Sequence, residues 1–72
     1  MCLAVPACIV SVANDEAVLD IAGIRRSGSV ALIDHPQPGE WVVLHSGIAL
    51  TRIDPHAADI MLGKLRLLGE VA

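Results

Sequence analysis

The sequence predicts a mainly β protein, a small five-stranded barrel followed by one C-terminal α-helix. Short apolar stretches alternate with turn signals roughly every 8–12 residues, a spacing typical of small β-sandwiches and barrels. Hydrophobic residues make up 54% of the 72 residues and aromatic residues only 1%, so the core must consist of Val, Ile, Leu and Ala. The last apolar segment has a helical period instead. Together these features favour an OB-like barrel with a helix after its last strand.

The first two strands are expected over residues 9–13 and 17–21, where β-branched and apolar side chains are frequent. Residues 14–16 (NDE) separate them, and Asn and Asp tolerate the backbone conformations of tight turns. Residues 22–23 (AG) then permit a sharp bend into the next strand. This part of the chain therefore predicts two short strands separated by a turn.

The third strand is expected over residues 24–33. Residues 34–39 (DHPQPG) form the clearest loop, because two prolines and a glycine cannot join a regular ladder. Residues 41–45 (WVVLH) make the strongest strand of the chain. A turn at residues 46–47 then leads to a fifth strand over residues 48–53.

A helix is expected over about residues 55–68. Asp54 can cap its exposed amide groups, and Pro55 suits the first helical position. Apolar residues at helical spacing predict one apolar stripe, while Leu62 and Leu67 fall off it, and the helix would lie against the barrel or project toward a partner. The stripe consists of Ala57, Ile60, Met61, Leu65 and Leu68.

The length predicts a single domain over residues 1–72, with the barrel in about residues 1–53. A chain of this size buries only about 60% of its extended surface, which leaves little room for a catalytic pocket. We therefore expect an adaptor, carrier or subunit. The formal net charge of −3 argues against nucleic-acid binding, which depends on basic side chains. No apolar run approaches the roughly 20 residues that span a membrane, and no secretion signal is recognisable, so a cytoplasmic protein is expected.

Cys2 directly follows the initiator methionine, which is generally removed before so small a residue. The mature chain would then begin with a cysteine that carries both a free amine and a thiol. A nearby ammonium group favours the thiolate, the form that ligates soft metals and attacks electrophiles. Cys8 is the only other cysteine, and two cysteines do not make a disulfide framework.

Two segments of the chain resemble the signatures of one family. Residues 1–6 (MCLAVP) resemble the start of the HypC/HupF hydrogenase maturation chaperones, and residues 39–49 (GEWVVLHSGIA) resemble their second signature. Residues 18–26 also look like the second and third strands of that family. Length and element order agree, so the resemblance covers nearly the whole chain. Cys8 departs from the pattern, since the family often has a polar or charged residue there.

The resemblance implies a non-enzymatic cytoplasmic helper in building the active site of NiFe hydrogenases. Such proteins hold an iron atom together with HypD while cyanide and carbon monoxide ligands are attached. They then accompany the iron to the precursor of the hydrogenase large subunit. HypE is a further candidate partner, reached through the HypC–HypD complex. The iron would be bound transiently and shared with HypD.

Carried onto this chain, the resemblance assigns metal ligation to Cys2 and His45. Thiolate and imidazole both suit iron. The residues expected to contact partners are Cys2, Leu3, Val5, Pro6 and His45. No catalytic residue is implied.

Several residues also have simpler interpretations. On its own, His45 would be a half-buried histidine at the end of a strand, bonded to backbone. Val5 and Pro6 either shape the N-terminal arm or start the barrel. Exposure to solvent is the default for Arg25, Arg26 and Arg52, with contact to acidic partners as the alternative.

Two other functions are alternatives. An N-terminal cysteine nucleophile could use its own freed amine as the base. The chain has no obvious oxyanion glycine segment, however. An OB-type nucleic-acid-binding module would need basic grooves and stacking aromatics, and this chain has one Trp and an acidic balance.

Overall fold

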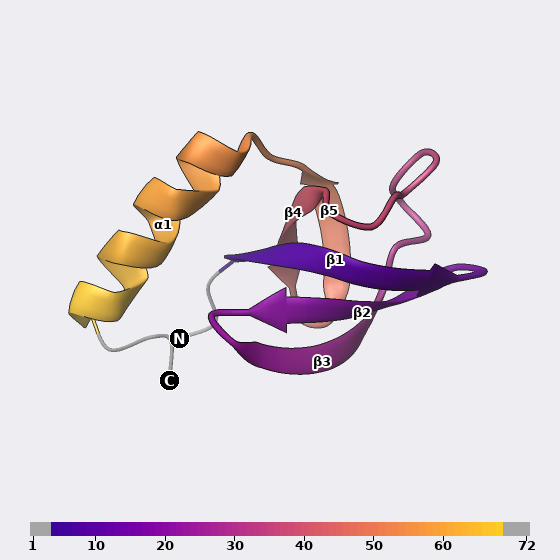
Figure 1. Ribbon diagram of the computed structural model, residues 1–72, viewed down its shortest axis with the longest axis horizontal. Coiled ribbons are helices and arrows are strands. Elements are labelled where there is room, and N and C mark those ends of the chain that lie inside the picture. Colours follow the sequence, from indigo (N-terminus) through magenta and orange to yellow (C-terminus); the bar gives the residue numbers. More distant parts are fainter. Residues whose placement is uncertain (1–3, 69–72) are drawn as a thin grey trace.

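The computed structural model describes residues 4–68, with side chains described for residues 4–63. Figure 1 shows a β-barrel flanked by one helix that leans away from it. The elements in chain order are β1 (Val5–Ala13), β2 (Glu16–Ile21), β3 (Ile24–Ser29), β4 (Trp41–His45), β5 (Ile48–Arg52) and α1 (Pro55–Leu68). The mainly β fold, its five strands and its C-terminal helix are as the sequence predicts.

The strands close into a barrel in the order β1-β2-β3-β5-β4. β1 pairs with two neighbours, antiparallel to β2 along one edge and antiparallel to β4 along the other. An irregularity between Ile9 and Ser11 leaves Val10 as an extra residue, and such bulges let a strand bend between two ladders. The barrel is completed by one parallel pair, Ser29 with Ile48. Closure between β3 and β5 is therefore much shorter than the antiparallel pairings.

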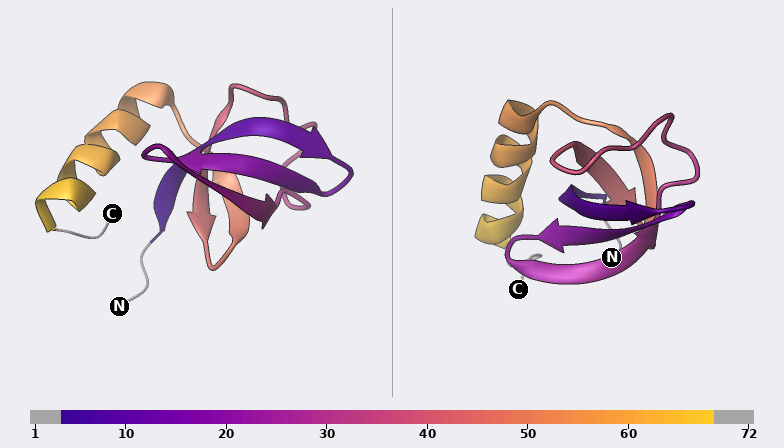
Figure 2. Two further views of the ribbon diagram at one scale, coloured as in Figure 1. Left: turned by 60° about the horizontal axis from the view of Figure 1, so that its bottom comes forward. Right: turned by 45° about the vertical axis from the view of Figure 1, so that its right-hand side comes forward.

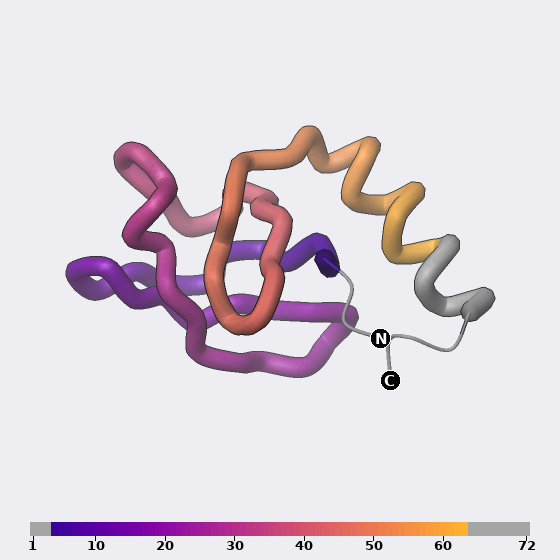
Figure 3. Tube along the Cα trace, turned by 180° about the vertical axis from the view of Figure 1, so that it is seen from behind, coloured from indigo at the N-terminus to yellow at the C-terminus, as the bar shows by residue number. Residues whose placement is uncertain are grey.

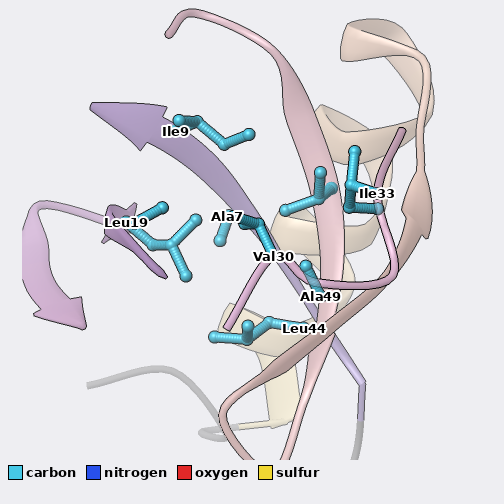
Figure 4. Close-up of a cluster of buried hydrophobic side chains, with 9 residues drawn as sticks. Ala7, Ile9, Leu19, Val30, Ile33, Leu44 and Ala49 are labelled. Atoms are coloured by element: carbon cyan, nitrogen blue, oxygen red, sulfur yellow. The ribbon is translucent and has the colours of Figure 1, made fainter. Parts of the chain in front are cut away.

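The core is aliphatic, as the composition requires. Figure 4 shows the buried side chains converging from different strands into the barrel interior. The cluster consists of Ala7, Ile9, Ala17, Leu19, Val30, Ile33, Val42, Leu44 and Ala49. Each strand that contributes to it does so from alternate positions, because successive side chains point to opposite faces of a strand. Trp41, the single aromatic residue, stays half-buried outside this cluster.

The predicted third strand is too long. β3 ends at Ser29, and residues 30–33, expected to continue it, form a turn instead. The Val30 N–H donates to the Asp15 carbonyl at 2.7 Å, and the Ile33 N–H donates to the Val30 carbonyl at 3.0 Å. Both side chains still enter the core. The apolar run over residues 30–33 predicts a strand, but in the structure it is a turn whose apolar side chains still pack in the core.

The long connection between β3 and β4 is held by an arginine. Arg52 Nε donates to Glu40 Oε2 at 2.8 Å, and its Nη2 donates to the carbonyls of Asp34 and His35. The Gln37 N–H donates to Glu40 Oε1 at 2.8 Å. Figure 3 shows this connection beside the β4–β5 hairpin. Arg52 is exposed, as expected by default, and its hydrogen bonds also fasten the loop to the end of β5.

Helix α1 begins as predicted. Asp54 Oδ2 accepts from the N–H groups of His56 at 3.0 Å and Ala57 at 3.3 Å, which is the expected N-cap arrangement. The buried face differs from the predicted stripe. Ala58 and Leu62 are buried whereas Ile60 is 47% exposed, so Leu62 is not off the packed face as expected. Helix α1 packs against β1. The side chains of Leu65, Leu67 and Leu68 lie outside the described residues.

Gly28 marks the tightest contact between β3 and the rest of the barrel. A Cβ at this position would lie 2.7 Å from Leu19 Cδ1 and 3.0 Å from the backbone carbonyl oxygen of Gly47. A leucine methyl can move, but the Gly47 carbonyl belongs to the turn that closes the barrel. The absence of a side chain at Gly28 is therefore a condition for closure between β3 and β5.

Gly28→Ala should destabilise the protein by about 1–3 kcal/mol, the usual cost of overpacking. Urea unfolding followed by circular dichroism measures this change. Gly63→Ala is the matched control, because nothing lies within 4 Å of its added Cβ and Ala favours the helix by up to about 1 kcal/mol. A Gly28→Ala protein as stable as the parent would contradict the steric argument.

The loop fastening should also make stability depend on pH. The hydrogen bond from Arg52, followed by that from the Gln37 N–H, holds the pKa of Glu40 below its usual range. A carboxyl group with a lowered pKa in the folded state stabilises the fold above its unfolded pKa, about 4.3 for Glu. This contribution is lost as the pH falls through the folded pKa. Glu40→Gln should therefore be less stable than the parent at pH 7, with the difference shrinking in acid.

Urea midpoints of both proteins across the acid range test this expectation. Because the pair is exposed, added salt should reduce the difference at neutral pH as well. Parallel curves for parent and variant at every pH would show that Glu40 does not stabilise the fold through its charge.

Candidate functional site

The described residues that the sequence assigns to the site lie at the start of β1 and at the end of β4. Cys2 and Leu3 lie outside the described residues. Val5 is the first residue of β1 and packs, half-buried, against the core. His45 is the last residue of β4. Their placement follows from the register between the two strands.

That register places the start of β1 beside the end of β4. Val5 pairs with Leu44, the residue before His45, and Pro6 pairs with Val43. The two segments that resemble the family signatures, far apart in sequence, are thus neighbours in the barrel. A sequence alone gives no signal for this register, which depends on the whole closure of the sheet.

Pro6 is fully buried and forms part of β1. The Ile9 N–H donates to the Glu40 carbonyl. Backbone groups alternate in direction along a strand, so those of the neighbouring odd-numbered residues point toward β4, and the backbone nitrogen of Pro6 points toward the β2 side. Pairing with β2 begins only at Cys8. The missing N–H of Pro6 therefore removes no ladder bond, which explains a proline inside this strand. Of its two interpretations, starting the barrel is the one that the structure supports, and contact with a partner stays a prediction.

His45 is exposed, so the interpretation as a half-buried histidine is wrong. It pairs with Ile48 across a two-residue turn of Ser46 and Gly47, whose φ values are 52° and 80°. Such turns need positive φ at both central residues, and glycine meets this at no steric cost. The turn sets where β4 ends and leaves the imidazole at the barrel rim, accessible to a ligand or a partner.

The described part of the chain does not hold a complete metal site. No group of three or more His, Cys, Asp or Glu side chains lies close enough together there to bind a metal ion. His45 is the described member of the predicted ligand pair. A metal bound at this rim would need ligands from outside residues 4–63, from Cys2 or from another protein.

Cys8 lies away from this rim. It pairs with Trp41 at the far end of β4 from His45, and with Asp20 on β2. Burial, and to a lesser degree the nearby Asp20 charge, raise the pKa of the Cys8 thiol. A thiol kept protonated is a poor ligand and a poor nucleophile. The structure therefore supports a structural role for Cys8.

Two surface hollows lie apart from His45. One of about 270 Å³ is lined by Gly39, Glu40, Trp41, Arg52, Ile53 and Pro55. The other, on the outer face of β1 to β3, is lined by Ser11, Ala13, Glu16, Ala17, Val18 and Ser27. Trp41 thus borders the first of these surface hollows.

A sequence model of the HupF/HypC family matches residues 1–65 of the chain, which spans the barrel and most of α1. The chain belongs to the HupF/HypC family. The matched region includes both predicted ligands, Cys2 and His45, and the ladder that joins β1 to β4. The resemblance noted in the two signature segments is therefore confirmed.

Relatives in this family are similar over nearly the whole chain. The hydrogenase maturation factor HypC of Cupriavidus necator is 39% identical over 72 residues, which cover 99% of this chain and 77% of that protein. HypC of Azotobacter chroococcum is 40% identical, with 100% and 87% covered. The maturation factor HybG of Escherichia coli K12 is 36% identical, with 92% and 89% covered. These names describe maturation factors and not enzymes. Within the described residues, no helix has the length and apolar character needed to cross a membrane.

The Cys8 thiol should react slowly with iodoacetamide. In a Cys2→Ala variant Cys8 is the only thiol, and its alkylation rate should rise at a pH above about 8.5, where an ordinary cysteine ionises. Asp20→Asn should lower that pH only slightly, because burial contributes more than the Asp20 charge. Alkylation at neutral pH as fast as that of free cysteine would mean that Cys8 is an accessible, reactive thiol.

Proposed function

We propose that this chain is a hydrogenase maturation chaperone that, with HypD, carries iron bearing cyanide and carbonyl ligands. The chain would deliver this iron to the precursor of the large subunit of a NiFe hydrogenase. The iron is cargo in this proposal and not a resident cofactor. The observation that carries the proposal is the pairing of Val5 with Leu44, which brings the start of β1 next to the strand ending in His45.

The donor chemistry of the two predicted ligands supports an iron cargo. A thiolate from Cys2 is a strong soft donor, and the imidazole of His45 suits iron as well. His45 is exposed at the rim, so it can reach a metal without unfolding the barrel. Two protein ligands would leave several positions of the iron free for cyanide, carbonyl or partner groups.

Incomplete coordination also supports a carrier role. The described residues offer no site with three or more protein ligands. A chaperone must release its metal, and a site finished by a partner can be dismantled when the partner leaves. HypD would supply the remaining ligands, and HypE would meet the chain through the HypC–HypD complex.

Partner contact around the site is expected at Cys2, Leu3, Val5 and His45. Pro6 is buried, so its contribution would be to hold β1 against β4. HypD and the large-subunit precursor would each approach the rim formed by the start of β1 and the end of β4. The relatives of the chain carry the names of hydrogenase maturation factors, which supports partners from the same machinery.

Neither alternative function is favoured by a specific observation. An N-terminal nucleophile enzyme would need a pocket beside Cys2, and that residue lies outside the described residues. A nucleic-acid module would need cations beside its aromatic residue. The cation beside Trp41 is Arg52, and it is already bonded to Glu40.

Cys2→Ala and His45→Ala should both fold normally and fail as carriers. Cys2→Ala should abolish the complex with HypD and leave the large-subunit precursor unprocessed. Loss of a residue that only orients a metal ligand costs metal sites about 10–100-fold in affinity, so loss of the His45 ligand itself should weaken iron retention by at least about tenfold. Iron analysis of the co-purified complex, infrared cyanide and carbonyl bands, and the gel mobility of the large subunit measure these effects.

His56→Ala is the matched control for the imidazole, because His56 is exposed in the first turn of α1. Cys8→Ala is the control for the thiol. Both should retain iron and support processing. Normal hydrogenase processing in cells that make only the Cys2→Ala protein would overturn the proposal.

A further inference from the structure

Strand β3 has one edge without a neighbouring strand. Six residue pairs join it to β2, from Glu16–Ser29 to Ile21–Ile24. On its other edge, only Ser29 pairs, with Ile48 of β5. Within the described strands, residues 24–28 thus have β2 on one side alone. Figure 2 shows β3 beside β2 in both views.

The backbone groups that face this edge can be assigned. The Ser29 N–H donates to the Gly47 carbonyl at 2.8 Å, so Ser29 directs its hydrogen-bonding groups away from β2. In an antiparallel pair, successive residues alternate between facing the partner strand and facing away. Ser27 and Arg25 therefore also face away from β2. Their N–H and C=O groups point to the same side of β3 as the Ser29 N–H that donates to Gly47.

The side chains along this edge include two neighbouring cations, Arg25 and Arg26. Leu19, fully buried, pairs with Arg26, while Asp20 pairs with Arg25. The two arginines therefore project on opposite faces of the sheet, and both are exposed. Asp20 Oδ1 accepts from the Gly23 N–H at 2.8 Å, which ties one oxygen of that carboxylate to the turn. Within the described residues, neither Arg25 nor Arg26 forms an ion pair.

These charges also restrict what could pair there. Charged edge residues commonly prevent a strand from pairing with a second copy of itself. Two β3 edges in contact would place Arg25 and Arg26 against the same residues of another chain, which is unfavourable. An acidic strand would instead place carboxylates opposite them, and opposite charges directly across a ladder stabilise it. Ile24, next to the pair, is 40% exposed and offers an apolar contact.

We propose that the free edge of β3 binds an extended acidic segment of a partner protein as an added strand. Because Arg25 and Arg26 lie on opposite faces, the segment should carry two consecutive acidic residues, with an apolar residue beside them facing Ile24. Main-chain hydrogen bonds to Arg25 and Ser27 would give affinity, and the carboxylates specificity. The segment would lie beside the turn that follows His45. This binding needs neither iron nor Cys2, so it is independent of the function proposed above.

Two variants separate strand addition from simple charge attraction. Ser27→Pro removes one edge-facing N–H and leaves the ladder to β2 intact, because Ser27 faces away from β2. Ser27→Ala is its matched control, since alanine keeps the N–H. The double variant Arg25→Gln with Arg26→Gln removes the charges and keeps the backbone.

The probe is a short synthetic peptide with two consecutive glutamates among valines and threonines, compared with the same peptide containing glutamines. Titration of the full chain, followed by amide NMR and hydrogen exchange, should show protection of the Arg25 and Ser27 amides. Ser27→Pro should weaken binding at least roughly tenfold and Ser27→Ala less than twofold. The double glutamine variant should weaken it roughly 2- to 30-fold, as should the glutamine peptide.

Four outcomes would overturn the proposal. The acidic peptide could leave both amides unprotected. Binding could be lost with the arginines yet unaffected by Ser27→Pro, which would mean charge attraction without strand addition. The Arg25 and Ser27 amides could also be protected already in the free chain, which would mean that the edge is occupied. A dimer in sedimentation would then assign the edge to a second copy, and a monomer would assign it to the chain's own terminal residues.

Discussion

The fold depends on β1 being shared by two antiparallel ladders. One edge of this strand pairs with β2 and the other with β4, so the hairpins that follow in sequence can close around a common interior. The extra residue Val10 lets β1 bend from one ladder toward the other. Residues on both sides of this bulge, Ala7 and Ile9 among them, fill the interior. Loss of β1 would therefore separate the two halves of the barrel.

Much of this architecture is encoded locally. The strand over residues 41–45 and the helix over residues 55–68 have the bounds that the sequence predicts, because each is delimited by strong turn or capping residues. The errors lie where packing outweighs pattern. Val30 and Ile33 look like strand residues but enter the core from a turn. Likewise, α1 buries Ala58 and Leu62 and leaves Ile60 exposed, a choice of face that helical spacing alone does not decide.

The candidate site is predictable in its residue types but not in its assembly. Cys2 and His45 stand out through the family signatures, and the family match confirms that resemblance. The neighbourhood of β1 and β4 follows from the pairing of Val5 with Leu44, which no local pattern reveals. The same holds for Arg52, whose bonds to Glu40 and to the loop join residues that are far apart in sequence. Long-range register and charge pairing are the properties that a single sequence hides.

The uneven pairing of β1 has a mechanical consequence. Its ladder with β4 starts at Val5, whereas its ladder with β2 starts only at Cys8. Force applied to the beginning of the chain is thus borne first by β4, while the β2–β3 hairpin is shielded from it. Since β4 ends in His45, a protein that grips and pulls the leading residues would drag the histidine's strand along. The start of β1 and the end of β4 would then move together and could not be displaced independently.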